Sequence, residues 1–101
     1  MSAIVINVGK QMNGITFRLD HETKAMLATR IPGWSPATPA SDSVFLWCDR
    51  QWDYERMRGP MWTQVVMLLS GLNENQIREL GGFKFISPAD DHQVVYESLA
   101  A

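Results

Sequence analysis

The chain has 101 residues, of which 46% are hydrophobic and 20% charged, so it can form one domain (residues 1–101) with one core. Its formal net charge is −2, with nine Lys and Arg against eleven Asp and Glu. This balance disfavours duplex nucleic acid as a partner, because affinity for a duplex comes largely from neutralising its phosphates. A single cysteine, Cys48, excludes an intramolecular disulfide, and the N-terminus has no signal-peptide pattern, so we expect a cytoplasmic protein.

The first predicted element is a β-hairpin. Residues 3–8 are rich in β-branched side chains and apolar on both faces, which predicts an inner strand. Asn13 and Gly14 form the strongest short turn signal in the chain, because both residue types accept positive φ. Residues 15–19 then alternate apolar and polar side chains, which predicts a strand with one buried and one solvent-facing side.

A helix over residues 21–30 is predicted next, with Asp20 as its N-cap and Pro32 ending it. Residues 15–27, Ile-Thr-Phe-Arg-Leu-Asp-His-Glu-Thr-Lys-Ala-Met-Leu, resemble the opening of ribbon-helix-helix transcriptional regulators, in which an alternating strand enters the major groove and a capped helix follows. The resemblance implies a dimeric DNA-binding regulator that uses the 15–19 strand, with Thr16 and Arg18 as base readers. It covers about an eighth of the chain, and a proline-rich loop stands where the family has a short turn and a second helix.

That loop, residues 31–42, holds three of the five prolines. Loops of this length without secondary structure are uncommon in compact domains and are often functional. Trp34 has two interpretations: it pins the loop to the core, or it is exposed for a ligand or partner. One functional alternative is therefore a small-ligand-binding domain or enzyme with the 31–42 loop as a lid and Trp34 and Trp52 at its mouth.

Residues 43–48 are predicted to form a central strand, because both of its faces are apolar. Residues 49–58 fit a strand or a helix. We favour the helix, because Pro60 requires a new start and charges of both signs are interspersed.

The stretch over residues 47–58, from Trp47 to Arg58, is the predicted partner-binding surface. Trp, Tyr and Arg are enriched at interface hot spots, and here they alternate with acids that can pair with the arginines. This surface has two functional interpretations: it binds a protein partner, or it binds a nucleic-acid backbone and stacks on the bases. Nucleic acid is not favoured. The third interpretation is a connector whose aromatic side chains are core. The predicted partner-binding residues are Arg50, Trp52, Tyr54, Arg56 and Arg58, with Trp34.

Residues 60–71 are predicted to form a helix that is apolar nearly all round, opened by Pro60 and ended by Gly71. Such a helix lies in a core or in a partner interface, so a homo-oligomer remains open. It is too short to span a bilayer, and no membrane association is expected.

The C-terminal part is predicted as a helix over 74–80 capped by Asn73, a stop at Gly81-Gly82, and a strand over 83–86. Residues 89–100 have two interpretations. Ser87-Pro88 opens a helix, which we favour, whereas the Val-Val-Tyr run prefers a closing strand.

No catalytic residue, metal site or cofactor is predicted. Nothing in the spacing brings His21 or His92 to Cys48, which has the surroundings of a core residue. The acidic and histidine residues near 21–22 and 90–92 have no zinc-site spacing and stand where helix openings favour acids. The sequence also lacks a phosphate-binding glycine loop, a nucleophile elbow and a paired-acid motif.

These patterns predict an α+β domain. A small, mostly antiparallel sheet, built from the N-terminal hairpin and the strands near 43–48 and 83–86, carries the 60–71 helix buried on one face. The predicted function is a non-catalytic interaction protein that binds and modulates or inhibits a larger macromolecular partner. By analogy, small acidic proteins without motifs are often accessory factors of mobile elements, such as phage inhibitors of host machinery.

Overall fold

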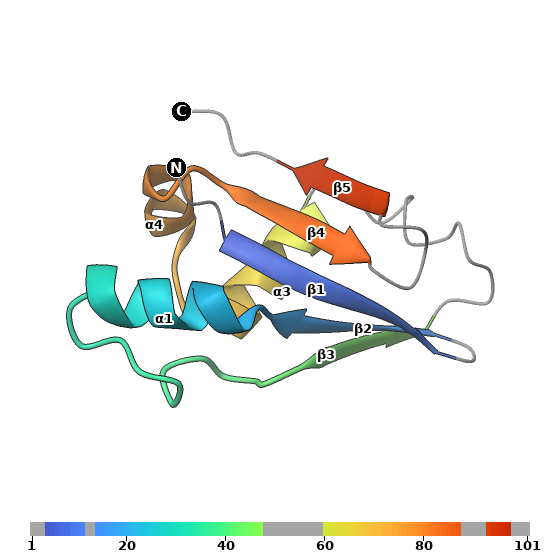
Figure 1. The fold of residues 1–101 in the computed structure, drawn as a ribbon, viewed down its shortest axis with the longest axis horizontal. Coiled ribbons are helices and arrows are strands. Elements are labelled where there is room, and N and C mark those ends of the chain that lie inside the picture. The colour runs from blue at the N-terminus through green and yellow to red at the C-terminus, as the bar shows by residue number, and fades with distance from the viewer. Residues whose placement is uncertain (1–3, 12–13, 48–59, 88–92, 98–101) are drawn as a thin grey trace.

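Five strands form one mixed sheet in the computed structural model of the chain, which describes residues 4–11, 14–47, 60–87 and 93–97 (Figure 1). The strands are β1 (Ile4–Gln11), β2 (Gly14–Leu19), β3 (Val44–Trp47), β4 (Phe83–Ser87) and β5 (Gln93–Glu97). The helices in the described ranges are α1 (His21–Arg30), α3 (Pro60–Ser70) and α4 (Glu74–Glu79).

The strand order is β3-β2-β1-β4-β5, and every neighbouring pair is antiparallel except β1 with β4. The predicted α+β fold with a mostly antiparallel sheet is therefore confirmed, and β1 is the inner strand that its two apolar faces predicted. None of the helices in the described ranges combines the length and apolarity needed to cross a membrane.

The register gives the sheet two different faces. One, the core face, carries the buried side chains of β1, β2 and β4 and lies against α3. The other, the open face, carries the alternate residues of the same strands, which are half-buried or exposed except for the buried Gly14. In Figure 1, α3 lies behind the sheet while α1 and α4 lie beyond one end, so no described helix covers the side facing the viewer. The core-face residues are Ile4, Ile6, Val8, Ile15, Phe17, Leu19, Phe83 and Phe85, with Val44 and Leu46 partly buried beside them.

An aromatic cluster joins α3 to the core face. The ring of Phe85 contacts Trp62 of α3 edge-to-face at 4.1 Å between centroids, and contacts Phe17 and Phe83 at 5.6 and 5.4 Å. Edge-to-face packing sets the positive ring edge against a negative ring face, which adds to the burial of these large side chains. The prediction that the 60–71 helix is buried against one face of the sheet is thus confirmed, with Val65, Val66 and Leu69 also in the core.

Both predicted helix caps are present. The Asp20 carboxylate accepts a hydrogen bond from the Glu22 N–H (3.1 Å) and another from the Asn7 side-chain amide (2.8 Å), which ties α1 to β1. Asn73 and Gln76 form a reciprocal capping box at the start of α4. Gly81 and Gly82 both have positive φ, 94° and 88°, and turn the chain from α4 into β4.

Three sequence predictions are wrong in detail. The 43–48 strand is not central: β3 lies at the edge of the sheet, and its alternate apolar residues face solvent. Gly14 is not a loop residue of the hairpin, because it pairs with Gln11 as the first residue of β2. The favoured C-terminal helix is replaced by the alternative, a closing strand β5, since residues 93–97 pair with β4. The choice between helix and strand for 49–58 lies outside the described residues.

Candidate functional site

Two exposed aromatic residues stand next to each other on the open face of β3. Trp47 is 75% exposed and Phe45 39%, and their rings meet edge-to-face at 5.2 Å and 89°. We call them the aromatic pair. Aromatic side chains of this size are ordinarily desolvated in a core or an interface, so two of them together in water mark a candidate contact surface.

Gly14 explains how the aromatic pair is held. It lies opposite Trp47 in the β2–β3 register, and Phe45 lies opposite the next open-face residue, Thr16. A Cβ atom on Gly14 would come within 2.6 Å of Phe45 Cε1 and 2.7 Å of the Leu46 carbonyl oxygen. The ring of Phe45 therefore rests over the bare backbone of Gly14, and Trp47 packs against that ring.

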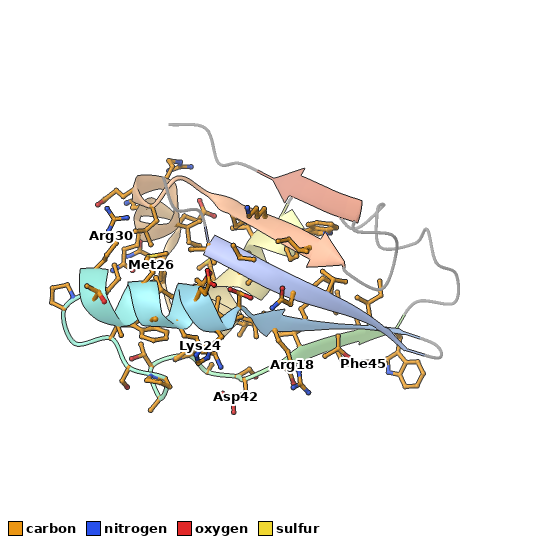
Figure 2. The ribbon with its side chains drawn as sticks, in the orientation of Figure 1. Arg18, Lys24, Met26, Arg30, Asp42 and Phe45 are labelled. Carbon is orange, nitrogen blue, oxygen red and sulfur yellow. The ribbon has the colours of Figure 1, made fainter. Side chains whose placement is uncertain are left out.

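The open face beside the aromatic pair has small side chains and a positive charge. Gly9 and Thr16 are small, and the next charged side chain along β2 is the exposed Arg18. Figure 2 shows Arg18 and Phe45 projecting along the same margin of the sheet. Among the described open-face strand residues the charged side chains are Arg18 and Lys84, and none is a carboxylate.

The main chain of β3 adds a second feature to this margin. The Asp20 N–H donates to the Val5 carbonyl oxygen at 2.9 Å, next to the Ile6–Leu19 pair of the register. This bond shows that main-chain groups of residues 5 and 20 are directed toward each other. Hydrogen-bonded pairs alternate along an antiparallel ladder, so Arg18 and Thr16 direct their main-chain groups to β1, and Ile15 and Phe17 direct theirs to β3.

The same alternation fixes the direction of the groups on β3. Val44 and Leu46 lie opposite Phe17 and Ile15, so their N–H and C=O groups pair with β2. Those of Phe45 and Trp47 point away from the sheet. Figure 1 shows no described element beyond this edge.

A separate surface hollow lies on the opposite side of the molecule, where the 31–42 loop meets α3. This hollow of about 520 Å³ is lined by Thr38 and Ala40 of the loop and by Gln64, Met67 and Leu68 of the helix. No charged side chain lines it. Leu68 is 45% exposed there, so the outer side of α3 also presents apolar surface.

Trp34 is one of the predicted site residues, and the structure places it in the core at 6% exposure. Its indole Nε1–H donates to the Ser70 carbonyl oxygen at 2.7 Å. Within the loop, the Thr38 N–H donates to the Ser35 carbonyl oxygen and forms a turn. The first interpretation of Trp34, that it pins the loop to the core, is what the structure shows. A side chain this deeply buried offers little surface to a partner.

The remaining predicted site residues, Arg50, Trp52, Tyr54, Arg56 and Arg58, lie in 48–59, outside the described residues, and their role stays a prediction. Sequence reasoning missed Phe45 as a surface residue because every residue of β3 is apolar, and a strand that is apolar on both faces is usually buried. The sequence signal that could have found it is Gly14, a residue without a side chain on the neighbouring strand.

The other residues considered for chemistry are dispersed. His21 is exposed at the start of α1, while Cys48 and His92 lie outside the described residues. Within the part of the chain that the structure describes, no three His, Cys, Asp or Glu side chains are grouped to hold a metal ion.

The ribbon-helix-helix resemblance does not extend to the fold around its strand. β2 is paired on both sides, with β1 and β3, and β3 rather than a second helix follows the loop. Of the two base readers that the resemblance implies, Arg18 is exposed on β2 and Thr16 is half-buried.

Fold and surface together define a small α+β domain with a helix on one face of its sheet and a packed, exposed aromatic pair at the edge of the other. No protein-family model matches the chain, and comparison with curated proteins and with solved structures finds no match either.

Proposed function

We propose that this chain is a non-catalytic interaction protein that binds a larger protein partner through the open face around Phe45 and Trp47. The observation that carries the proposal is the exposed aromatic pair packed over Gly14. Interface hot spots are rich in Trp and cluster where aromatic anchors lose their water on binding. Full burial of a large apolar side chain is worth about 1.5–3 kcal/mol. The free protein forgoes most of this gain at Trp47, which is 75% exposed.

Packing against Gly14 also favours binding. A side chain that is already ordered loses less conformational entropy on association, and this loss is about 0.5–1.5 kcal/mol for each side chain immobilised. The open-face charges, Arg18 and Lys84, would suit a partner surface that is neutral or acidic.

The proposed surface is continuous in sequence with the predicted partner-binding residues, because Arg50 follows Trp47 by three positions. In this proposal residues 50–58 extend the contact that Phe45 and Trp47 begin. The protein acts in the cytoplasm and modulates or inhibits its partner by covering part of it, as phage accessory proteins do.

The test is a pull-down with the tagged full chain from an extract of its native cells, comparing wild type, Trp47→Ala and a matched control. Leu68→Ala is the control, since Leu68 is also a large exposed apolar residue but lies on α3. Truncating a hot-spot residue costs about 2 kcal/mol or more, which is about a 30-fold loss of affinity.

We therefore expect Trp47→Ala to lose the captured protein and Leu68→Ala to keep it. Urea unfolding of both variants confirms that each is folded. Capture that survives Trp47→Ala would refute the proposal, as would retention of DNA that weakens steeply with salt.

The hollow between the 31–42 loop and α3 favours a second candidate function, binding of a small uncharged apolar ligand. Its volume of about 520 Å³ lies within the range of small-molecule sites, and its lining is uncharged. Native mass spectrometry of gently purified protein tests this candidate. A bound ligand that is lost on Leu68→Lys and kept on Trp47→Ala would favour it, and ligand-free protein would count against it.

A further inference from the structure

We infer that the partner adds an extended segment beside β3 and so becomes a sixth strand of the sheet, an inference that rests on the proposed function. The occupant is a stretch of about four residues in β conformation from a protein partner, uncharged and apolar at successive positions. The basis is the edge of β3, where the residues that expose their rings also direct their main-chain groups outward.

The main chain defines what can bind there. The N–H and C=O groups of Phe45 and Trp47 point away from β2, as the Asp20–Val5 hydrogen bond and the two registers require. Main-chain groups along an open strand edge form a template for another strand, and strand addition satisfies them with hydrogen bonds of regular spacing.

The side chains of β3 include none of the residue types with which proteins block strand addition. Its four residues, Val-Phe-Leu-Trp, include no charge, proline or glycine. The opposite edge strand, β5, begins with Gln93 and ends with Glu97. Because β3 carries no charge, an uncharged segment can lie beside it without losing an ionic partner.

The side chains of β3 define the composition of the segment. On the open face an added strand would lie beside the aromatic pair, and on the core face beside Val44 and Leu46, which are partly buried against the core. Residues on one face of neighbouring strands have Cβ atoms about 4.5–5.5 Å apart, so both faces of the segment would contact apolar side chains. We therefore expect β-branched or aromatic residues on both faces of the segment.

Two variants at one position separate strand addition from docking by side chains alone. Phe45→Ala removes the ring and leaves the main-chain N–H, whereas Phe45→Pro removes the ring and the N–H. Since that N–H does not pair with β2, proline is compatible with this edge position. Affinity is measured by titrating each purified variant with the protein captured by the wild-type chain.

We expect Phe45→Pro to bind at least 10-fold more weakly than Phe45→Ala. Equal affinities of the two variants would overturn strand addition and leave the proposed function standing. If Trp47→Ala keeps full capture, the proposed function itself fails, so the two failures are distinguishable.

Hydrogen exchange resolved to single amides gives a readout that needs no substitution. In the free chain the amides of Val44 and Leu46 should exchange slowly and those of Phe45 and Trp47 quickly, and the captured protein should slow the latter pair at least 10-fold. Protection of Phe45 and Trp47 in the free chain that rises with its concentration would show that a second copy occupies the edge, which would overturn a partner strand.

Discussion

The indole Nε1–H of Trp34 donates a hydrogen bond of 2.7 Å to the main-chain carbonyl oxygen of Ser70, at the last residue of α3. Carbonyl groups in the last turn of a helix have no partner within the helix, so this bond satisfies one of them from a loop 36 residues away in sequence. The Ser70 hydroxyl donates to the Val66 carbonyl oxygen and accepts from the Leu72 N–H. The loop and the helix end therefore form one hydrogen-bonded unit beneath the surface.

Trp34→Phe should lower the free energy of unfolding by about 1–3 kcal/mol, because it leaves a buried carbonyl without its donor and makes the side chain smaller. Urea unfolding measures the change. The matched control is Trp47→Phe, which makes the same replacement at a side chain that is 75% exposed and should change stability by less than about 0.5 kcal/mol. Equal effects at both positions would mean that Trp34 does not hold the loop.

Gly14→Ala should destabilise the protein by about 1–3 kcal/mol, since its Cβ would meet the Phe45 ring and the Leu46 carbonyl oxygen. In a double-mutant cycle with Phe45→Ala, part of this cost should disappear, and the part that the carbonyl imposes should remain. Gly9→Ala is the control, because a Cβ there meets only the Thr16 carbonyl oxygen at 4.0 Å. We expect it to be neutral or stabilising by up to about 1 kcal/mol.

Asp20→Ala should cost about 1–2 kcal/mol, because one carboxylate caps α1 and also accepts the Asn7 amide. Asp20→Asn keeps an acceptor oxygen for the helix N–H and should lose less. Asp42→Ala, at an exposed loop carboxylate, serves as the control and should lie within about 0.5 kcal/mol of wild type. Thermal unfolding followed by circular dichroism ranks the variants, and a loss for Asp42→Ala as large as for Asp20→Ala would contradict the capping role.

Phe85→Leu should cost about 1–3 kcal/mol and should cost more than Phe83→Leu. The ring of Phe85 packs against Phe17, Trp62 and Phe83, and so links β2, α3 and β4, while Phe83 packs against Phe85. Chemical denaturation compares the two variants, which make the same substitution two residues apart on one strand. A larger loss for Phe83→Leu would show that the cluster is not centred on Phe85.

Sequence patterns predicted most of the architecture because helix caps and strand alternation depend on residues that are close in sequence. Asp20 and Asn73 cap their helices through hydrogen bonds to residues two or three positions further along the chain. The alternation of apolar and polar residues over 15–19 leaves one side of this strand that can be buried. The candidate site was predicted less well. The sequence allowed Trp34 either a core position or a partner surface, and it is core; the sequence placed Phe45 in a central strand, and it is exposed. Both residues are apolar aromatics in short segments, and their own sequence surroundings do not distinguish the two environments.

The sequence by itself determined several elements: the hairpin, the capped helices, and a 60–71 helix too apolar to lie in water. Their periodicity and caps depend on residues within a few positions of one another. Only the tertiary structure decided that β3 is the edge strand, that residues 93–97 close the opposite edge, and that Trp47 faces solvent. Strand order depends on pairings between residues distant in sequence, and a strand apolar on both faces fits the edge of a sheet as well as its middle.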